Sequence, residues 1–225
     1  MIDVAQQIGA VTREVASGER DGAPVKTVVA RQTYPSPIEE VWDALTNPER
    51  LPRWFLPVSG ELTLGGRFQF EGNAGGTVLE CEPTTLLLVT WEYGGEVSWV
   101  EVRLTAEGQS TTLRLEHTAP MDAERWEEFG PGAIGVGWDS GLLGLALHLR
   151  GAAPMELEAK MAWGGSEEGR AFMAASSQDW ARAAIADGDG ETPARAAASR
   201  TTAAYTGVEQ HEQHGQTGQH GQLQA

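Results

Sequence analysis

The feature that most constrains the fold is a series of short apolar segments separated by turns. Residues 58–62, 65–72, 75–83, 86–93, 96–106 and 110–118 form this series. The last two segments alternate apolar and polar residues with the period of a β-strand. Glycines fall at most of the joints, where short turns favour them. Consecutive strands with short joints predict an antiparallel meander.

A strand and a helix precede the meander. Residues 25–34 are rich in β-branched side chains and predict a first strand. Ser36 is followed by Pro37 and Glu39, a pattern typical of a helix start at which the serine hydroxyl accepts a backbone N–H. On this interpretation the substitution Ser36→Ala costs about 1 kcal/mol of stability.

The helix that follows has one apolar face. Apolar residues recur at spacings of three and four within residues 37–46, so that this face has to be buried. The Asn-Pro pair at 47–48 predicts a second short helix, which Pro52 keeps short. Trp54 and Phe55 follow directly. Two short helices cannot bury an apolar face by themselves, and we expect them to pack against the sheet.

After the meander the apolar period becomes helical. Large apolar residues recur at helical spacing at Trp138, Leu142, Leu145 and Leu149. Gly137, Gly141 and Gly144 form a neighbouring face without side chains, which lets the helix approach another element closely. Each glycine costs roughly 1 kcal/mol of helix propensity, and a packing gain has to offset that cost.

Further helices are predicted at 154–162 and at 166–187, where Ser166 precedes two glutamates. At the N-terminus, Val4, Ile8, Val11 and Val15 predict a helix within residues 1–17. We therefore divide the chain into an N-terminal helix and linker (1–23), a central domain with a helical extension (24–187) and a largely disordered tail (188–225). Within that tail residues 194–205 are compatible with a helix, and the rest is of low complexity.

The composition excludes several classes of function. The chain carries 32 acidic and 16 basic residues, a formal charge of −16, and a field of this sign repels nucleic-acid phosphates. No apolar run approaches the length of roughly 20 residues that a membrane span requires, and no secretory signal is expected. The single cysteine, Cys81, cannot form an internal disulfide, which fits the cytoplasm. We expect no metal and no cofactor.

Several segments resemble the SRPBCC (START-like) superfamily, and within it bacterial proteins similar to the activator of the ninety-kilodalton heat-shock-protein ATPase. They are PSPIEEVWDALTNPERLPRWF, GGRFQFE, GGTVLECEPTTLLLVTWEY, TTLRLEHT and the helix from Gly137 to Leu149. The resemblance covers residues 25–150, and its most specific part is the VWDALT…PERL..WF block.

The resemblance implies an α+β helix-grip fold. In this fold a curved antiparallel sheet of six to seven strands surrounds a long helix, with two short helices after the first strand and, in this chain, extra C-terminal helices. Relatives hold a lipid, polyketide, hormone or aromatic compound in a cavity between sheet and helix. Which of the helices 132–151 and 166–187 the sheet grips stays open, and the second could cover the cavity.

Two residues offer a route to chemistry. His117 shares a strand face with Leu113 and Leu115, so we expect it on the concave side of the sheet, hydrogen-bonded in the core rather than catalytic. Glu101 shares its strand face with Trp99 and Arg103. Glu101 is either outward and solvated, which is favoured, or inward and paired with Arg103, where desolvation would make it a candidate general acid or base.

We predict a binding domain whose cavity accepts a small hydrophobic or aromatic ligand. The candidate lining residues are Trp54, Phe70, Trp91, Trp99, Leu115, His117, Trp138 and Leu142. One alternative, implied by the resemblance, is an enzyme of the cyclase, dehydratase or hydrolase type that acts on a polyketide-like substrate in the same cavity. Another is a co-chaperone-like module whose partner is a chaperone or another protein.

Overall fold

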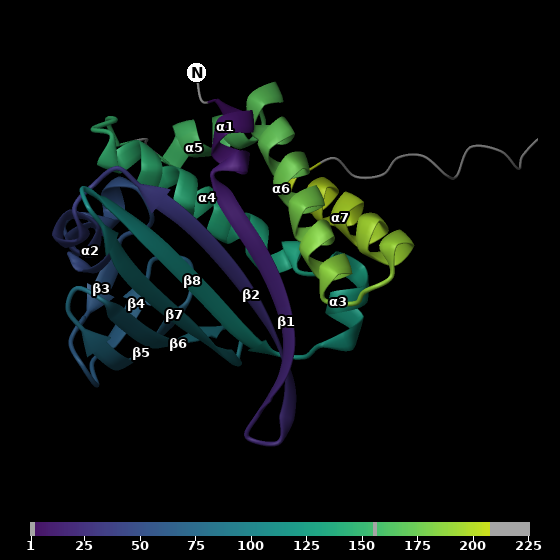
Figure 1. The fold of residues 1–225 in the computed structure, drawn as a ribbon, viewed down its shortest axis with the longest axis horizontal. Helices are drawn as coiled ribbons and strands as arrows, with labels where there is room; N and C mark the ends of the chain where they lie inside the picture. Colours follow the sequence, from purple (N-terminus) through teal and green to yellow (C-terminus); the bar gives the residue numbers. More distant parts are fainter. Residues whose placement is uncertain (1–2, 155–156, 208–225) are drawn as a thin grey trace, which may run out of the picture.

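The computed structural model describes residues 3–154 and 157–207, which form one sheet and a set of helices (Figure 1). The strands are β1 (Val11–Arg20), β2 (Ala23–Tyr34), β3 (Val58–Gly60), β4 (Arg67–Phe70), β5 (Gly75–Glu82), β6 (Leu86–Tyr93), β7 (Glu96–Glu107) and β8 (Ser110–Pro120). The helices are α1 (Val4–Gly9), α2 (Ile38–Thr46), the 3-10 turn η1 (Leu51–Arg53), α3 (Ala123–Phe129), α4 (Gly132–Leu149), α5 (Leu157–Gly164), α6 (Glu167–Ala186) and α7 (Glu191–Thr206). None of these helices is long and apolar enough to cross a membrane.

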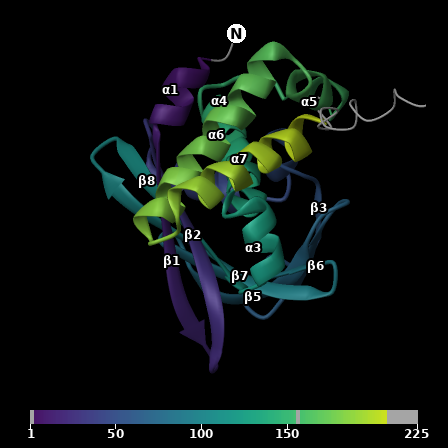
Figure 2. The same cartoon turned by 90° about the vertical axis from the view of Figure 1, so that its right-hand side faces the viewer.

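The sheet is a single antiparallel layer in the order β1-β2-β8-β7-β6-β5-β4-β3. It curves around α4, which lies against its concave side, and α6 packs on the far side of α4 (Figures 1 and 2). The helix that the sheet grips is therefore α4. α6 also contacts β1, and α7 lies across α6 and contacts α3. The helix-grip fold is confirmed, with a second helical layer behind the gripped helix.

The sheet has one strand more than the six to seven predicted. The additional strand is β1, where the sequence pattern predicted a continuation of the N-terminal helix. Val11 and Val15 are four residues apart, which places them on one face of a helix but equally on one face of a strand. In the structure β1 pairs with β2, and Val15 lies opposite Val28. The prediction of a helix is therefore correct for residues 4–9 and wrong from residue 11 onward.

The helix start at Ser36 differs from the prediction by one residue. α2 begins at Ile38 with Pro37 at the N-cap position, and no side chain caps it. Ser36 is buried, and its carbonyl oxygen accepts a hydrogen bond from the Thr111 hydroxyl at 2.8 Å. The predicted capping box, and with it the predicted cost of Ser36→Ala through a lost cap, is therefore wrong. The second helix is also shorter than predicted, because it is only the three-residue turn η1.

The C-terminal part contains more ordered structure than predicted. Ser166 accepts the backbone N–H of Gly169 at 3.1 Å and caps α6, as its sequence context predicts. α7 then forms within residues 188–225, which the sequence analysis treated as a largely disordered tail. Ala194 and Ala198 of α7 are buried against Ala181 of α6, because small side chains let two helices approach closely. The low-complexity stretch after residue 207 lies outside the described residues.

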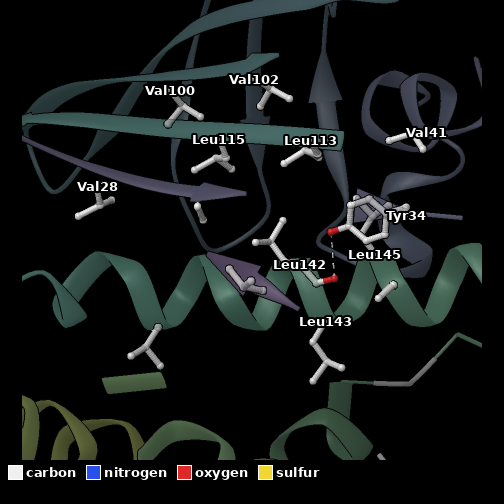
Figure 3. Close-up of a cluster of buried hydrophobic side chains, with 14 of the residues drawn as sticks. Val28, Tyr34, Val41, Val100, Val102, Leu113, Leu115, Leu142, Leu143 and Leu145 are labelled. Carbon is white, nitrogen blue, oxygen red and sulfur yellow. Dashed lines mark hydrogen bonds between the residues drawn. The ribbon is translucent and has the colours of Figure 1, made fainter. Parts of the chain in front are cut away.

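The core lies between the sheet and α4. Figure 3 shows Leu113 and Leu115 of β8 facing α4, with Leu142 on the side of the helix toward the sheet and Leu143 on the opposite side. The hydroxyl of Tyr34 on β2 donates to the carbonyl oxygen of Leu142 at 3.4 Å. α4 therefore has apolar contacts on both faces, with the sheet on one and with α6 on the other.

Candidate ligand cavity

A cavity of about 340 Å³, which we refer to as the inner chamber, lies between the concave side of the sheet, α4 and the segment that contains α2 and η1. Six of the eight predicted residues line it: Trp54, Phe70, Trp91, Leu115, Trp138 and Leu142. The structure thus brings together the residue that follows η1 and residues of three strands and α4 around one space.

The lining of the inner chamber is almost wholly apolar. Apart from tryptophan indoles, Thr46 and Cys81 are its side chains with a polar atom. The Thr46 hydroxyl donates to the carbonyl oxygen of Trp42 at 2.8 Å, and the Trp54 indole donates to that of Ala44 at 2.9 Å. These polar groups therefore have partners in the protein. Such a surface suits an apolar molecule better than water.

One side of the inner chamber reaches solvent. On this side the lining includes the half-buried Leu45, Thr46, Leu62, Cys81 and Leu87 and the exposed Pro83. These residues come from the end of α2, the loop after β3, and the ends of β5 and β6 with the turn between them.

A second hollow of about 600 Å³, the outer chamber, adjoins the first. It lies between the ends of β6, β7 and β8, the helix α3 and the first turns of α4, with Tyr205 of α7 at its edge. His117 lines this outer chamber and not the inner one. The predicted position of His117 on the concave side is confirmed, because it is buried on the same strand face as Leu115.

Three aromatic side chains form a wall between the chambers. Phe55, Trp91 and Trp138 line both of them. The rings of Phe55 and Trp138 are nearly parallel, with an interplanar angle of 11° and centroids 6.3 Å apart, and the rings of Trp91 and Trp138 are 5.1 Å apart. Trp138 therefore stands at the centre of the wall, in contact with both neighbours.

A chain of hydrogen bonds holds Trp138 in place. The Trp138 indole N–H donates to Nδ1 of His117 at 3.0 Å, and Nε2 of His117 lies 2.8 Å from the hydroxyl oxygen of Ser98. The Ser98 hydroxyl in turn donates to the carbonyl oxygen of Trp91 at 3.0 Å. Since Nδ1 accepts, Nε2 carries the proton and donates to Ser98. The chain links Trp138 to the backbone of Trp91, a second member of the wall.

The same surroundings fix the charge of His117. Burial lowers the pKa of His117 from 6.5 to about 4, because the charged ring would lose its hydration. The ring is therefore neutral at pH 7. Both of its nitrogens are engaged, which agrees with the prediction of a hydrogen-bonded core histidine.

Trp99 does not line either chamber, and its prediction as a lining residue is wrong. Ser98 and Val100 point to the concave side of β7, so Trp99 between them points to the convex side. There the guanidinium of Arg20 lies 3.8 Å from the centre of its ring. Glu101 faces the same convex side and pairs with Arg103 at 2.5 Å. The outward orientation that was favoured for Glu101 is the observed one, but the side chain is half-buried and forms the pair with Arg103 that was expected of the inward position.

Glycines let α4 pack closely on both sides. A Cβ atom at Gly144 would lie 2.5 Å from the carbonyl oxygen of Trp54, and one at Gly135 would lie 2.2 Å from the ring of Trp180 on α6. The predicted purpose of the glycine face is thus confirmed for Gly144, which allows the Trp54 segment to close one end of the inner chamber.

A buried ion pair ties the N-terminal strand and α6 to α4. Nε of Arg13 on β1 lies 2.9 Å from Oδ2 of Asp139 on α4, and Nη1 of Arg13 lies 2.9 Å from Asp179 on α6. The same Asp139 oxygen accepts hydrogen bonds from Ser176 and from the Trp180 indole. Burial raises the pKa of Asp139, and the charge of Arg13 opposes this effect. The cluster joins three elements behind the gripped helix.

Sequence reasoning missed several lining residues. Val89, Val102, Leu113 and Leu145 also line the inner chamber. For Val89 and Leu113 the signal was available, because they share the strand parity of Trp91 and Leu115 respectively. Val102 was missed because the choice of Trp99 assigned the opposite parity of β7 to the cavity. Cys81 gave no such signal. A bulge between Val78 and Glu80 shifts the register of β5, so that Cys81 and not Glu80 faces the chamber.

Among residues 3–154 and 157–207, no three His, Cys, Asp or Glu side chains gather in a group that could hold a metal ion.

The chain matches the family model described as Activator of Hsp90 ATPase homolog 1-like protein over residues 35–149, just over half of its length. The crystal structure of CalU16 from Micromonospora echinospora is 32% identical, with 80% of this chain and 99% of that chain covered and a TM-score of 0.63. The solution NMR structure of CalU16 gives 34% identity, coverage of 79% and 97%, and a TM-score of 0.64.

The conserved protein EF2215 of Enterococcus faecalis, of unknown function, is 18% identical over 68% of this chain and 86% of that chain, with a TM-score of 0.50, and shows the fold alone. A comparison with curated proteins gave no match. The resemblance found in residues 25–150 is confirmed by the family match and by CalU16. The chain belongs to the family of Activator of Hsp90 ATPase homolog 1-like proteins, within the START-like superfamily.

Proposed function

We propose that the inner chamber binds a small hydrophobic or aromatic molecule and releases it unchanged. The observation that carries this proposal is the chemistry of the lining, which combines aliphatic and aromatic side chains with a single titratable group, the thiol of Cys81. Proton transfer to a bound molecule needs a positioned acid or base within hydrogen-bond reach. Binding by shape needs none.

The enzymatic alternative, a cyclase-, dehydratase- or hydrolase-type reaction in the same cavity, has weaker support. His117 lines the outer chamber, and both of its ring nitrogens have partners in the protein. Glu101 lies on the convex side of the sheet, paired with Arg103. Neither residue can exchange a proton with a molecule in the inner chamber without a rearrangement.

Fluorescence of the uncharged probe N-phenyl-1-naphthylamine tests the proposal. We expect saturable binding of one probe molecule per chain. The variant Val102→Trp places a large ring in the inner chamber and should abolish binding, because Val102 is buried and lines the chamber. Thr105→Trp adds the same ring at an exposed position of the same strand and is the matched control. Circular dichroism of both variants verifies folding.

Cys81 provides a second readout, because it is the chain's single cysteine, half-buried in the chamber lining. Bound probe should slow the alkylation of Cys81 by monobromobimane in the wild type and in Thr105→Trp. Probe binding that Val102→Trp leaves unchanged, or that has no effect on the alkylation rate, would refute the assignment to the inner chamber.

A second candidate function follows from the family itself, whose description names activation of the Hsp90 ATPase. In this role the chain would act through its surface on a chaperone. Measurement of Hsp90 ATPase turnover with and without the full chain distinguishes the two. If the chain stimulates the Hsp90 ATPase and Val102→Trp preserves that stimulation, the chaperone role is supported. If a saturating concentration of the chain gives no stimulation, that role is excluded.

A further inference from the structure

The two chambers share three lining residues, the aromatic residues of the wall. Phe55, Trp91 and Trp138 each expose one part of their surface to the inner chamber and another to the outer chamber. These three side chains therefore lie where the two chambers meet.

Trp138 is the ring best placed to move. It is half-buried, and in α4 its neighbours Gly137 and Gly141 carry no side chains that would block its rotation. Its one hydrogen bond is the one to Nδ1 of His117. His117 is thus a positioning residue for the wall, and it acts through Trp138.

The rim of the outer chamber is unusually apolar for an exposed surface. Tyr93, Val97 and Tyr205 line it, with 61%, 44% and 39% of their surface exposed. Of the large apolar side chains in the described residues, the other two that are exposed are Leu64 and Leu79. Exposed apolar side chains that gather around a hollow mark a site of contact with a ligand or partner.

The lining of the outer chamber is more polar than that of the inner chamber, and its charged members are half-buried or exposed: Lys26, Arg125, Glu96 and Asp122. Nζ of Lys26 lies 2.9 Å from Asp187, which is outside the lining, and Arg125 lies 3.6 Å from Glu96. The buried polar side chains of the lining are the uncharged Ser98 and His117, so the chamber favours an uncharged polar group over an ion.

We propose that the two chambers are compartments of one site for an elongated molecule with an apolar part and an uncharged hydroxyl- or carbonyl-bearing end. The apolar part occupies the inner chamber, Trp138 turns aside, and the polar end lies in the outer chamber near His117 and Ser98. This inference rests on the proposed function, because it requires the inner chamber to bind apolar molecules. It adds the chemical class of the ligand and a second compartment that determines its length.

The test uses straight-chain primary alcohols, from hexanol to hexadecanol, as competitors of N-phenyl-1-naphthylamine. Short members fit the inner chamber alone, and long members have to cross the wall. In the wild type we expect affinity to rise by about two- to fourfold for each added methylene, up to the longest members. In Ala119→Phe, which adds a ring at a lining position of the outer chamber, the rise should stop partway along the series.

The expected loss for hexadecanol in Ala119→Phe is at least about tenfold, because several methylenes lose their contacts. Hexanol and the probe should keep their wild-type affinities. Gly137→Phe fills the same chamber from α4 and should give the same result if Ala119→Phe does not fold. Ala106→Phe, at an exposed position of β7 away from both chambers, is the control and should behave as the wild type.

The wall is tested by the rate of hexadecanol entry in stopped-flow displacement. His117→Leu removes the acceptor of the Trp138 indole and should speed entry by about fivefold, the effect of one hydrogen bond. His117→Gln retains an acceptor and a donor and should restore the wild-type rate. If the probe binds but neither Ala119→Phe nor Gly137→Phe changes the affinity for hexadecanol, the two-chamber inference is overturned and the inner-chamber proposal stays intact. No binding of probe or of any alcohol would overturn both.

Discussion

His117 is a buried histidine whose surroundings fix its protonation state. It is buried, neutral and bonded through both ring nitrogens to Trp138 and Ser98. Strand alternation placed it on the concave side, because it shares the parity of Leu115. The bonds themselves could not be read from the sequence, since Trp138 is 21 residues away on another element.

This environment predicts a specific pH dependence of stability. The pKa of His117 is about 4 in the folded state against 6.5 for the free side chain. The unfolded chain therefore takes up the proton first as the pH falls. The contribution of His117 is fully present above pH 6.5 and is lost progressively down to about pH 4, which amounts to about 2 kcal/mol between pH 7 and pH 5.

Urea unfolding of the wild type and of His117→Gln at the two pH values given above measures the contribution of His117 to the free energy of unfolding. The glutamine keeps one donor and one acceptor but does not titrate. We expect the wild type to lose more stability than the variant over this interval. Equal losses in both proteins would show that His117 is not a neutral buried histidine.

At the scale of elements, α4 packs against the sheet on one face and against α6 on the other. Its glycines differ in their surroundings: a Cβ at Gly135 would lie 2.2 Å from the fully buried ring of Trp180, whereas one at Gly137 meets the Tyr205 hydroxyl at 3.4 Å. The two substitutions to alanine should therefore have opposite signs. Gly135→Ala should destabilise the protein by about 1–3 kcal/mol through overpacking, and Gly137→Ala should stabilise it by up to about 1 kcal/mol through helix propensity. Thermal unfolding of the pair measures both, and a stabilised Gly135→Ala would contradict the packing described for α4 and α6.

The buried ion pair between Arg13 of β1 and Asp139 of α4 gives a second prediction at this scale. Arg13→Met leaves the carboxylate of Asp139 buried without its cation, and we expect a loss of about 3–5 kcal/mol. Arg31→Met removes a partly exposed pair with Glu14 between β1 and β2, and it should cost less than about 1 kcal/mol. Denaturant unfolding compares the two. Similar small losses in both variants would mean that the Arg13 cluster does not hold β1 and α6 to the gripped helix.

The elements also show where sequence reasoning succeeds and fails. β-Branched residues predicted β2, and turn residues predicted β3 to β8, with alternation clearest in β7 and β8, which bury one face and expose the other. The spacing of Val11 and Val15 fits a helix and a strand alike. The strand forms because residues 11–20 pair with the edge of β2, a long-range contact that the local sequence does not show. The bulge at Val78 and Glu80 reverses the parity of β5 without any turn signal in the sequence.

At the scale of the whole molecule, the family match covers the segment from α2 to α4, whereas β1, β2, α6 and α7 lie outside it. The family match ends at residue 149, yet α6 buries Phe172 and Trp180 completely. The sequence predicted α6 from its cap but left open which helix the sheet grips. That choice depends on long-range packing, such as Gly144 against Trp54, which no local pattern encodes.

The central claim is that the inner chamber is a ligand site, and the most direct measurement locates a bound molecule in it. Methyl NMR spectra of leucine-labelled protein, titrated with N-phenyl-1-naphthylamine, report on the lining residues Leu113, Leu115, Leu142 and Leu145. The account predicts saturable shifts of these methyl signals at one probe per chain. Shifts confined to the exposed Leu64 and Leu79, or no shifts at all, would contradict it.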